Sequence, residues 1–414
     1  MTKKKRHFSF NNKIYIFIIV LLTTAVALLI SFNLSPKAKK INGWIHTRGA
    51  TILDSANREV VIRGINYDEM TPLSFVYHQP DLTGLPDVCR LWNRAPTKLD
   101  AKEINKMGFN AVRLVLNWDN LEPLPPTVES GGNLIHKWNM DYVQAVDKTI
   151  NDLKKEKIAV ILDMHQYLWS SAFKYIVSED GQGCAGGGMP AWLYPDVKSL
   201  TFQEARCDFF KNIKYPAQPI NPQDGFLEAW KFLVERYKHN DSVIAADIIN
   251  EPWMVKGLCS PEDLDLNSFY EKYSIALRKI NPNLVLILED SQDFTDTPLA
   301  LSKPEDLTNI LYSFHLYTGN WNPDGLNRVE RFLQRATDWN IPLYIGEFDG
   351  FGWSNNLSKI DEPKLTREIT SMMDYFKKKQ VNWTFWSYSG MYSIMDPETK
   401  KAKIPLLKAL QRGF

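Results

Sequence analysis

Short apolar segments alternate with longer segments of helical periodicity along most of the sequence, and this alternation restricts the possible folds more than any other feature. The eight expected strands cover residues 60–66, 111–115, 158–164, 243–249, 284–289, 310–314, 343–347 and 382–388. Apolar residues recur at helical spacing between them, as at Met140, Val143, Val146, Ile150 and Leu153, and at Phe226, Trp230, Leu233 and Tyr237. Eight parallel βα units suit a closed (β/α)8 TIM barrel better than an open sheet, although the sequence alone allows both.

Residues 42–61 precede the first of these units and alternate apolar residues around turn signals. This pattern predicts a short β-hairpin cap on the barrel. The hydrophobic fraction of the chain is 44% and its charged fraction is 23%, which is enough for a large core. Residues 41–414 are therefore expected to form one α/β domain.

The first forty residues have a different composition. Residues 14–32 carry no charge, and they lie between five basic residues on the N-terminal side and three on the C-terminal side. A run of this length can span a bilayer, and the excess of basic residues before it favours an internal N-terminus. We expect residues 1–40 to be a signal-anchor, with the following domain extracytoplasmic. If the segment is a cleaved signal, the protein is secreted instead.

The charge of the chain gives no support to nucleic-acid binding. The whole chain carries a net charge of +1. Residues 1–40 hold eight basic residues and no acidic one, which leaves the remainder at −7. Nucleic-acid binding would call for a basic domain.

Two strand-to-helix connections are much longer than usual, at about residues 67–97 and 166–222. The four cysteines, Cys89, Cys184, Cys207 and Cys259, all fall in connections of this kind. None of them has zinc-ligand spacing, so we expect at least one disulfide that braces loops on the C-terminal face of the barrel. Three pairings are possible, and Cys184 with Cys207 is the first choice.

Polar residues end several of the apolar strands. Because parallel strands of a barrel end at one mouth, such residues share a pocket. Each alone has a structural explanation, but the full set is difficult to dismiss as chance. The members are Arg113, His165, Asn250, Glu251, His315, Glu347 and Trp386.

Two of these residues supply what cleavage of a glycosidic bond requires. Glu251 and Glu347 end the fourth and seventh strands, which face each other across an eight-stranded barrel. One carboxyl group can protonate the leaving oxygen, and the other can act at the anomeric carbon. A separation of about 5–5.5 Å between the carboxyls predicts retention of configuration, and ~6.5–9.5 Å predicts inversion.

The sequence resembles family 5 of the glycoside hydrolases, also called cellulase family A, from about residue 42 to the C-terminus. The motifs that carry the resemblance are NEP at 250–252, GEF at 346–348, HLY at 315–317, Trp386 and Arg113. The resemblance implies a retaining mechanism, and we expect neither a metal nor a cofactor. It also implies that Glu251 is the acid/base and Glu347 the nucleophile.

The other polar residues then take supporting roles. Asn250 is suited to bind the sugar 2-hydroxyl. Arg113 and Tyr317 are expected to keep Glu347 ionised, and the charge of Glu347 is expected to raise the pKa of Glu251. The remaining residues, His165, His315 and Trp386, are expected to bind substrate hydroxyls or to form the floor under a sugar ring.

Two further motifs are similar to the endoglycoceramidase-related subgroup of the family. They are LDMHQ at 162–166 and GMPAW at 188–192. That subgroup typically shows HQD and GAPAW, whereas here Tyr167 stands in place of the Asp and Met189 in place of the Ala. The expected substrate is therefore a polysaccharide, an oligosaccharide or a glycolipid with a β-glycosidic bond.

Other functional classes lack their signatures. A serine hydrolase would need G-x-S-x-G, and a metal hydrolase would need clustered histidines such as HExxH; neither occurs. The alternative outside enzymes is a catalytically inactive carbohydrate-binding barrel at the cell surface. Loss of Glu251 or Glu347 would indicate it, and both are present. The protein is expected to be a monomer.

Overall fold

The computed structural model describes most of the chain after the first 35 residues. The described ranges are 36–67, 99–176, 183–185, 187–195, 199–216, 218–252, 259–291, 300–317, 321–349, 362–389, 393–396 and 399–414. Outside these ranges lie the basic residues at the N-terminus, the uncharged run 14–32 that follows them, Cys89 and most of the first long connection. Within them, we find no helix with the length and apolar character that a membrane span requires.

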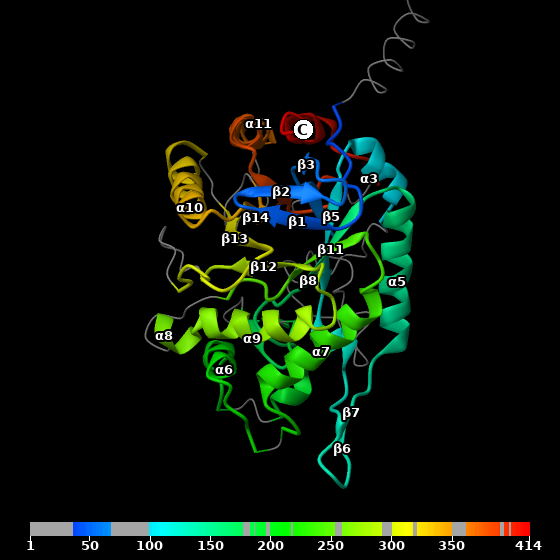
Figure 1. The fold of residues 1–414 in the computed structure, drawn as a ribbon, viewed down its shortest axis with the longest axis vertical. Helices are drawn as coiled ribbons and strands as arrows, with labels where there is room; N and C mark the ends of the chain where they lie inside the picture. Colours follow the sequence, from blue (N-terminus) through cyan, green and yellow to red (C-terminus); the bar gives the residue numbers. More distant parts are fainter. Residues whose placement is uncertain are drawn as a thin grey trace, which may run out of the picture.

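Eight parallel strands form a closed barrel at the centre of the molecule (Figure 1). In chain order they are β4 (Arg63–Tyr67), β5 (Ala111–Leu116), β8 (Ala159–Met164), β11 (Val243–Asp247), β12 (Val285–Glu289), β13 (Ile310–Leu316), β14 (Leu343–Phe348) and β15 (Asn382–Phe385). Each strand pairs with its neighbour in sequence, and β15 pairs with β4, where Trp383 lies opposite Arg63. The prediction of a closed (β/α)8 barrel is confirmed.

Helices follow seven of the eight strands and cover the outside of the barrel (Figure 1). They are α3 (Ala101–Met107), α5 (Met140–Lys155), α7 (Pro222–Tyr237), α9 (Leu266–Arg278), α10 (Leu326–Trp339), α11 (Glu362–Lys379) and α12 (Ile404–Gln411). The connection from β12 to β13 differs, because its described residues, 290–291 and 300–309, include no helix.

The sequence of α5 shows why these helices form and dock. Asn139 caps its N-terminus, where the Asn139 side chain accepts a hydrogen bond from the backbone N–H of Tyr142. Lys154 and Lys155 lie in the last turn, where positive charge is favourable. Four of its five periodic apolar residues are buried against the barrel, whereas Met140, in the first turn, is exposed. The predicted helical pattern is thus confirmed apart from its first residue.

A three-stranded antiparallel sheet closes the end of the barrel at which the strands begin. It consists of β1 (Ile45–Arg48), β2 (Thr51–Asp54) and β3 (Glu59–Val60). Its apolar side chains form one cluster with residues from the lower layers of the barrel, including Ile45, Ile52, Ile161, Ile244 and Val285. The predicted cap is present, with one strand more than a hairpin.

The chain enters the domain at this same closed end. The backbone N–H of Ala38 donates to the carbonyl of Gly108, just before β5, at 2.9 Å. Asn110 donates from its side chain to the carbonyl of Lys39, also at 2.9 Å. The ammonium group of Lys40 reaches the carbonyl of Glu156, which precedes β8. The first described residues therefore lie opposite the mouth of the barrel.

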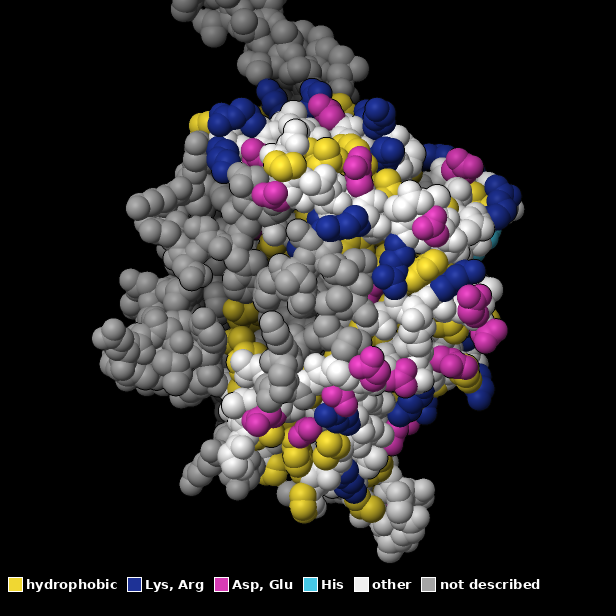
Figure 2. Space-filling view, turned by 90° about the vertical axis from the view of Figure 1, so that its left-hand side faces the viewer, with side chains coloured by type: hydrophobic (Ala, Val, Ile, Leu, Met, Phe, Trp, Pro, Cys, Tyr) yellow, Lys and Arg dark blue, Asp and Glu magenta, His cyan; other side chains and the backbone are white. Residues whose placement is uncertain are grey.

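Several short elements extend the connections at the other end. They are α4 (Trp118–Leu121), the hairpin β6 (Thr127–Val128) and β7 (Leu134–Ile135), the pair β9 (Lys174–Ile176) and β10 (Gly183–Ala185), η2 (Ala191–Leu193), α6 (Phe202–Phe210), α8 (Pro261–Leu264) and η3 (Trp321–Gly325). The β6–β7 hairpin projects from the body of the molecule (Figure 1). On the face drawn in Figure 2, basic and acidic side chains are interspersed over the described surface.

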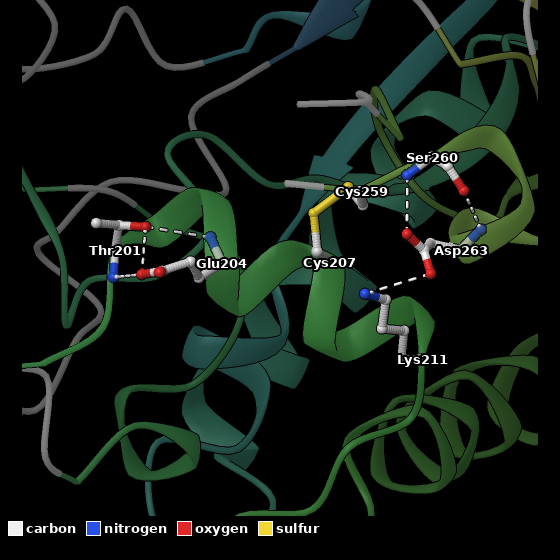
Figure 3. Close-up of a disulfide and its surroundings, with 7 residues drawn as sticks. All are labelled: Thr201, Glu204, Cys207, Lys211, Cys259, Ser260 and Asp263. Carbon is white, nitrogen blue, oxygen red and sulfur yellow. Dashed lines mark hydrogen bonds and ion pairs between the residues drawn. A yellow bond between two sulfur atoms is a disulfide. The ribbon is translucent and has the colours of Figure 1, made fainter. Parts of the chain in front are cut away.

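A disulfide joins two of these connections. Cys207 in α6 is bonded to Cys259, which precedes α8, with their Cα atoms 5.7 Å apart (Figure 3). The predicted pairing of Cys207 with Cys184 is wrong, because α6 packs beside α8 and so brings Cys259 to Cys207. The expectation of at least one disulfide among these connections is confirmed. An ion pair of 3.3 Å between Lys211 and Asp263 lies next to it.

Candidate active site

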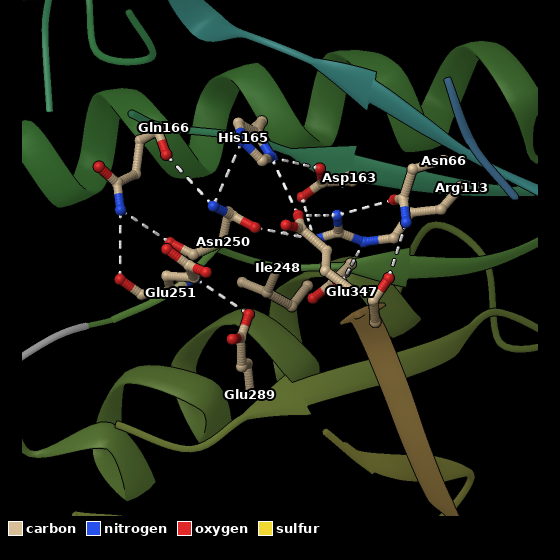
Figure 4. A network of polar contacts seen from close by, with 12 residues as sticks. Asn66, Arg113, Asp163, His165, Gln166, Ile248, Asn250, Glu251, Glu289 and Glu347 are labelled. Atoms are coloured by element: carbon tan, nitrogen blue, oxygen red, sulfur yellow. Dashed lines mark hydrogen bonds and ion pairs between the residues drawn. The ribbon is translucent and has the colours of Figure 1, made fainter. Parts of the chain in front are cut away.

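The eight residues predicted for the site all lie at the mouth of the barrel, in one continuous set of contacts (Figure 4 shows five of them). His315 and Glu347 are within the last two residues of β13 and β14, whereas Arg113 lies in the middle of β5. The others follow the ends of β8, β11, β13 and β15, namely His165, Asn250, Glu251, Tyr317 and Trp386. The ends of the strands thus converge as expected.

Arg113 is the centre of the network and is fully buried. Its Nη1 donates to Oε1 of Glu347 at 2.6 Å, its Nη2 to Oδ1 of Asn250 at 3.0 Å, and its Nε to Oδ2 of Asp247 at 2.9 Å. Nη2 also lies 3.0 Å from Oδ1 of Asp163. Burial favours the neutral form of Arg113, but the surrounding carboxylates outweigh it and raise its pKa well above the usual value. Arg113 therefore stays charged.

Glu347 is fixed through both of its carboxylate oxygens. Oε1 accepts from Arg113, and Oε2 accepts from the hydroxyl of Tyr317 at 2.6 Å. These are the two contacts that the sequence predicted for it. The preceding residue, Gly346, has a steric role: a Cβ atom there would lie 2.8 Å from Nε2 of His315. Glycine thus allows the imidazole to pack against β14.

Glu251 has a strained backbone that its neighbours hold in place. Its φ is 45°, in the left-handed region that glutamate rarely adopts. Its N–H donates to Oε2 of Glu289 at 2.9 Å, and its carbonyl accepts from the Gln166 side chain at 3.2 Å. Its carboxylate Oε1 lies 2.9 Å from Nδ1 of His315. A strained residue held on all sides is typical of functional sites.

The pKa of Glu251 is raised above its usual value, and burial is the leading cause. The neighbouring His165 and the charges of Arg113 and Arg206 act in the opposite direction. The predicted direction is therefore confirmed. The predicted cause, the charge of Glu347, is not among the principal ones. An acid with a raised pKa keeps its proton closer to neutral pH.

The two glutamates lie close together. A carboxylate oxygen of Glu251 and one of Glu347 are within 4.8 Å of each other, beside Nδ1 of His315. These two oxygens are closer than the separation of ~6.5–9.5 Å between carboxyl groups that leaves inverting enzymes room for a water molecule. Their proximity agrees with the separation of about 5–5.5 Å that accompanies retention.

The two histidines of the site are neutral near pH 7. Burial lowers the pKa of His165 to about 4 and that of His315 to about 3. Nδ1 of His165 lies 2.8 Å from Oδ2 of Asp163, an arrangement that favours a proton on Nδ1. The ring of Trp386 stacks on that of His165, with centroids 5.5 Å apart.

Among the residues that the structure describes, two groups of three side chains could bring ligand atoms together around a metal ion. They are Asp163, His165 and Glu347, and Glu251, His315 and Glu347. Glu347 belongs to both, and its two oxygens already accept from Arg113 and Tyr317. The charged guanidinium of Arg113 would oppose a divalent cation at this position. We therefore assign no metal to the site.

Sequence reasoning missed five buried polar residues that support the site. They are Asn66, Asp163, Gln166, Asp247 and Glu289. The signal was present, because Asp163, Asp247 and Glu289 interrupt or end strands that are otherwise apolar. Burial raises the pKa of both Asp163 and Asp247 to about 7. One arginine thus faces more carboxyl groups than it can neutralise.

Comparisons with known proteins agree with this geometry. The model of the family described as cellulase (glycosyl hydrolase family 5) matches residues 74–391. Endoglucanase C of Acetivibrio thermocellus is 22% identical over 320 residues, covering 73% of this chain and 77% of that protein. An endoglycoceramidase of Hydra vulgaris is 24% identical over 406 residues, covering 88% of this chain and 71% of that protein.

Solved structures share the fold. The crystal structure of endogalactoceramidase has a TM-score of 0.66 at 18% identity and covers 89% of this chain and 85% of its own. Endo-glycoceramidase II from Rhodococcus sp., in complex with ganglioside GM3, has a TM-score of 0.62 at 20% identity and covers 88% and 81%. Nothing in these comparisons supports the alternative of an inactive carbohydrate-binding barrel. The family match extends over more than three quarters of the chain and includes both glutamates: the chain belongs to glycosyl hydrolase family 5 and is a retaining glycoside hydrolase.

Proposed function

We propose that Glu347 is the nucleophile and Glu251 the general acid/base of a double displacement on a β-glycoside. The observation that carries this assignment is the contrast between the two environments. Glu347 accepts hydrogen bonds from a charged guanidinium and a phenol, both of which stabilise its anionic form. Glu251 has a raised pKa, which stabilises its protonated form.

In the first step, Glu251 donates its proton to the glycosidic oxygen while a carboxylate oxygen of Glu347 attacks the anomeric carbon. The bond to the leaving group breaks, and a covalent glycosyl-enzyme forms. In the second step, the Glu251 carboxylate removes a proton from water, and the resulting hydroxide displaces Glu347. Two inversions give net retention, and both glutamates return to their starting protonation states.

The surrounding residues hold the pair and the sugar. Arg113 and Tyr317 hold the two carboxylate oxygens of Glu347 in place. Asn250 binds the sugar 2-hydroxyl through its side-chain amide, whose oxygen is fixed by Arg113 at 3.0 Å. The remaining members of the set, His165, His315 and Trp386, line the pocket, and Trp386 supplies an aromatic face under a sugar ring.

The substrate that we propose is a β-linked polysaccharide, oligosaccharide or glycolipid. The endoglucanases among its relatives support a glucan, and the endoglycoceramidases support a glycolipid. Overlap with the endoglycoceramidase structures over nearly nine tenths of the chain makes a glycosphingolipid the first substrate to test. A hydrolysis screen over cello-oligosaccharides, mannans and glycosphingolipids distinguishes these classes, and a screen with no turnover of any β-glycoside would contradict the proposal.

The roles of the two glutamates can be tested separately. Glu347→Ala should abolish turnover of every substrate, because no glycosyl-enzyme can form. Glu251→Ala should turn over only aryl glycosides with good leaving groups, and its glycosyl-enzyme should accumulate. Azide should then rescue Glu251→Ala and give the β-glycosyl azide, whereas with Glu347→Ala it should give the α-anomer. Azides of the same configuration from both variants would show that the two roles are wrongly assigned.

We also propose that residues 1–40 attach the domain of residues 41–414 to a membrane, with the domain extracytoplasmic. The uncharged run and its basic flanks support this placement. Full-length protein should stay with membranes after alkaline carbonate washing and be cleaved by protease added to intact cells. Recovery of a shortened chain from the medium would instead indicate a cleaved signal. The barrel itself should behave as a monomer in sedimentation.

A further inference from the structure

Glu289 is a buried acid that the mechanism above does not use. It ends β12, between the strand that precedes Glu251 and the strand that carries His315, and its side chain is fully buried. The hydroxyl of Tyr270 donates to its carbonyl at 2.7 Å and accepts from its N–H at 3.1 Å. Its position is therefore fixed through the backbone. Among the described residues, no lysine or arginine forms an ion pair with its carboxyl group.

The carboxyl of Glu289 reaches Glu251 by two routes. The first is direct: Oε2 accepts from the backbone N–H of Glu251 at 2.9 Å (Figure 4). The second passes through His315, whose Nε2 lies 3.5 Å from Oε2 of Glu289 and whose Nδ1 lies 2.9 Å from Oε1 of Glu251. One imidazole thus separates two carboxyl groups. Within the described structure, Nε2 of His315 and Oε1 of Glu289 have no hydrogen-bond partner.

Proton sharing among these three groups follows from their burial. Burial lowers the pKa of His315 to about 3, so the ring is neutral and carries one N–H. Burial also raises the pKa of Glu289 well above its usual value. When Glu251 is protonated and donates to Nδ1, the N–H lies on Nε2 and faces a Glu289 carboxylate. When Glu251 is ionised, Nδ1–H can donate to it, and a protonated Glu289 can donate to Nε2. Both arrangements hold two protons, so one converts to the other without exchange with solvent.

We propose that Glu289 is a positioning residue for Glu251, which it orients through the Glu251 amide and whose proton it balances through the imidazole of His315. This inference rests on the proposed role of Glu251 as acid/base. Glu289 is fully buried and acts only through Glu251 and His315. Its effect must therefore appear in proton donation to the leaving group.

Other charged and titratable groups face Glu251, His315 and Glu289 from the surrounding elements. They are Arg113 on β5, Asp163 and His165 at β8, Arg206 on α6, Asp247 on β11, Tyr270 on α9, Tyr317 after β13, Arg328 on α10 and Glu347 on β14. All of them remain in a Glu289 variant. A change in the titration of Glu251 between wild type and variant therefore reports on Glu289.

The first test is Glu289→Gln. The glutamine can keep an oxygen at the position of Oε2, which accepts from the Glu251 amide and faces Nε2 of His315, but it removes the negative charge that Glu289 holds when Glu251 is protonated. This favours the Glu251 carboxylate, so the alkaline limb of the kcat/KM profile should move by about one pH unit toward lower pH. At neutral pH, hydrolysis of an alkyl β-glycoside should fall about tenfold, while a 2,4-dinitrophenyl β-glycoside, which needs little acid help, should react at the wild-type rate.

The matched control is Asp290→Asn. Asp290 is the next residue and is also buried, but it accepts from the hydroxyl of Tyr312 at 2.7 Å and from the N–H of Leu301 at 3.0 Å. This variant should leave both substrates and the pH profile unchanged. The fraction of correctly folded active sites in each variant is measured with a 2,4-dinitrophenyl 2-deoxy-2-fluoro-β-glycoside, which traps the covalent glycosyl-enzyme. Glu289→Leu, which also removes the acceptor for the Glu251 amide, should lose more alkyl glycoside activity per trapped site than Glu289→Gln.

A second background separates this inference from the proposed function. In the Glu251→Ala background, adding Glu289→Gln should change neither the rate of glycosyl-enzyme formation from the dinitrophenyl glycoside nor rescue by azide. The reason is that the Glu251 carboxyl, on which Glu289 acts, is absent. An additional loss there, or an equal pH shift in Asp290→Asn, would overturn the inference. So would a wild-type profile in Glu289→Gln while Glu251→Ala behaves as an acid/base variant. If Glu251→Ala itself shows no leaving-group dependence, the proposed function fails first.

Discussion

Removal of the Cys207–Cys259 disulfide should lower the free energy of unfolding substantially. The bond joins residues that are 52 positions apart, so in the unfolded chain it closes a loop of about that length. The loop-closure model gives an entropy loss of about 14 cal/mol/K for such a loop, or about 4 kcal/mol at 25 °C. Both cysteines are buried, so alanine also leaves a small cavity.

The assay is denaturant unfolding of the double variant Cys207→Ala/Cys259→Ala beside wild type, followed by tryptophan fluorescence without reductant. The midpoint for the variant should lie below the midpoint for wild type. Activity at 25 °C should survive, because Glu251 is held by Glu289 and Gln166 and not by the disulfide. Measuring both unfolding and activity therefore distinguishes a loss of stability from damage to the active site.

Cys207→Ser alone is the control for the thiol, because it breaks the bond but keeps a small polar side chain. Its midpoint should match that of the double variant. If the double variant and wild type unfold at the same denaturant concentration, the disulfide does not constrain the unfolded chain and the reasoning is refuted. A large loss of kcat in the double variant would show instead that the bond helps to hold Glu251 in place.

Two further predictions concern the pocket. The pKa of Asp163 is raised from 3.8 to about 7, so the stability that its proton contributes is fully present below pH 3.8 and is lost as the pH rises to 7. Relative to wild type, Asp163→Asn should therefore gain about 1 kcal/mol per pH unit between these values in chemical unfolding; a difference independent of pH contradicts this. Gly346→Ala places a Cβ 2.8 Å from Nε2 of His315, and should lower kcat on alkyl glycosides about 100-fold. The fold should be kept, with a lower melting point because the buried site is overpacked. Unchanged kinetics would mean that the imidazole is not held by this contact.

The barrel could be predicted from the sequence because its strands are buried on both faces and read as continuous apolar runs. Seven of the eight predicted strands overlap their observed counterparts closely. The first did not, since residues 60–66 contain parts of both β3 and β4. The apolar residues 60–62 lead directly into Arg63 without a turn signal, whereas the structure turns from the cap into the barrel at Val61 and Ile62.

The site was predictable where a polar residue ends an apolar strand, as with Glu251 and Glu347. The supporting acids were missed because a single Asp within a strand gives no sign of its partner. Asp247 meets Arg113 only because β5 and β11 both pair with β8, although the two residues are 134 positions apart in the chain. The predicted disulfide pairing was wrong for a similar reason. Cys207 and Cys259 lie in different connections, and which connections pack together depends on the packing of helices that the sequence does not specify.

The entry of the chain beside Gly108 and Asn110 has a consequence for how the enzyme would meet a lipid. An anchor attached ahead of residue 36 would hold the molecule by its closed base, because Ala38 and Lys39 are bonded there. The open end would then point away from the supporting bilayer. A glycolipid in that same bilayer could not enter without first being lifted out by a carrier or a micelle. Free saccharides, and headgroups on an apposed cell or vesicle, would arrive from the side that the pocket already faces.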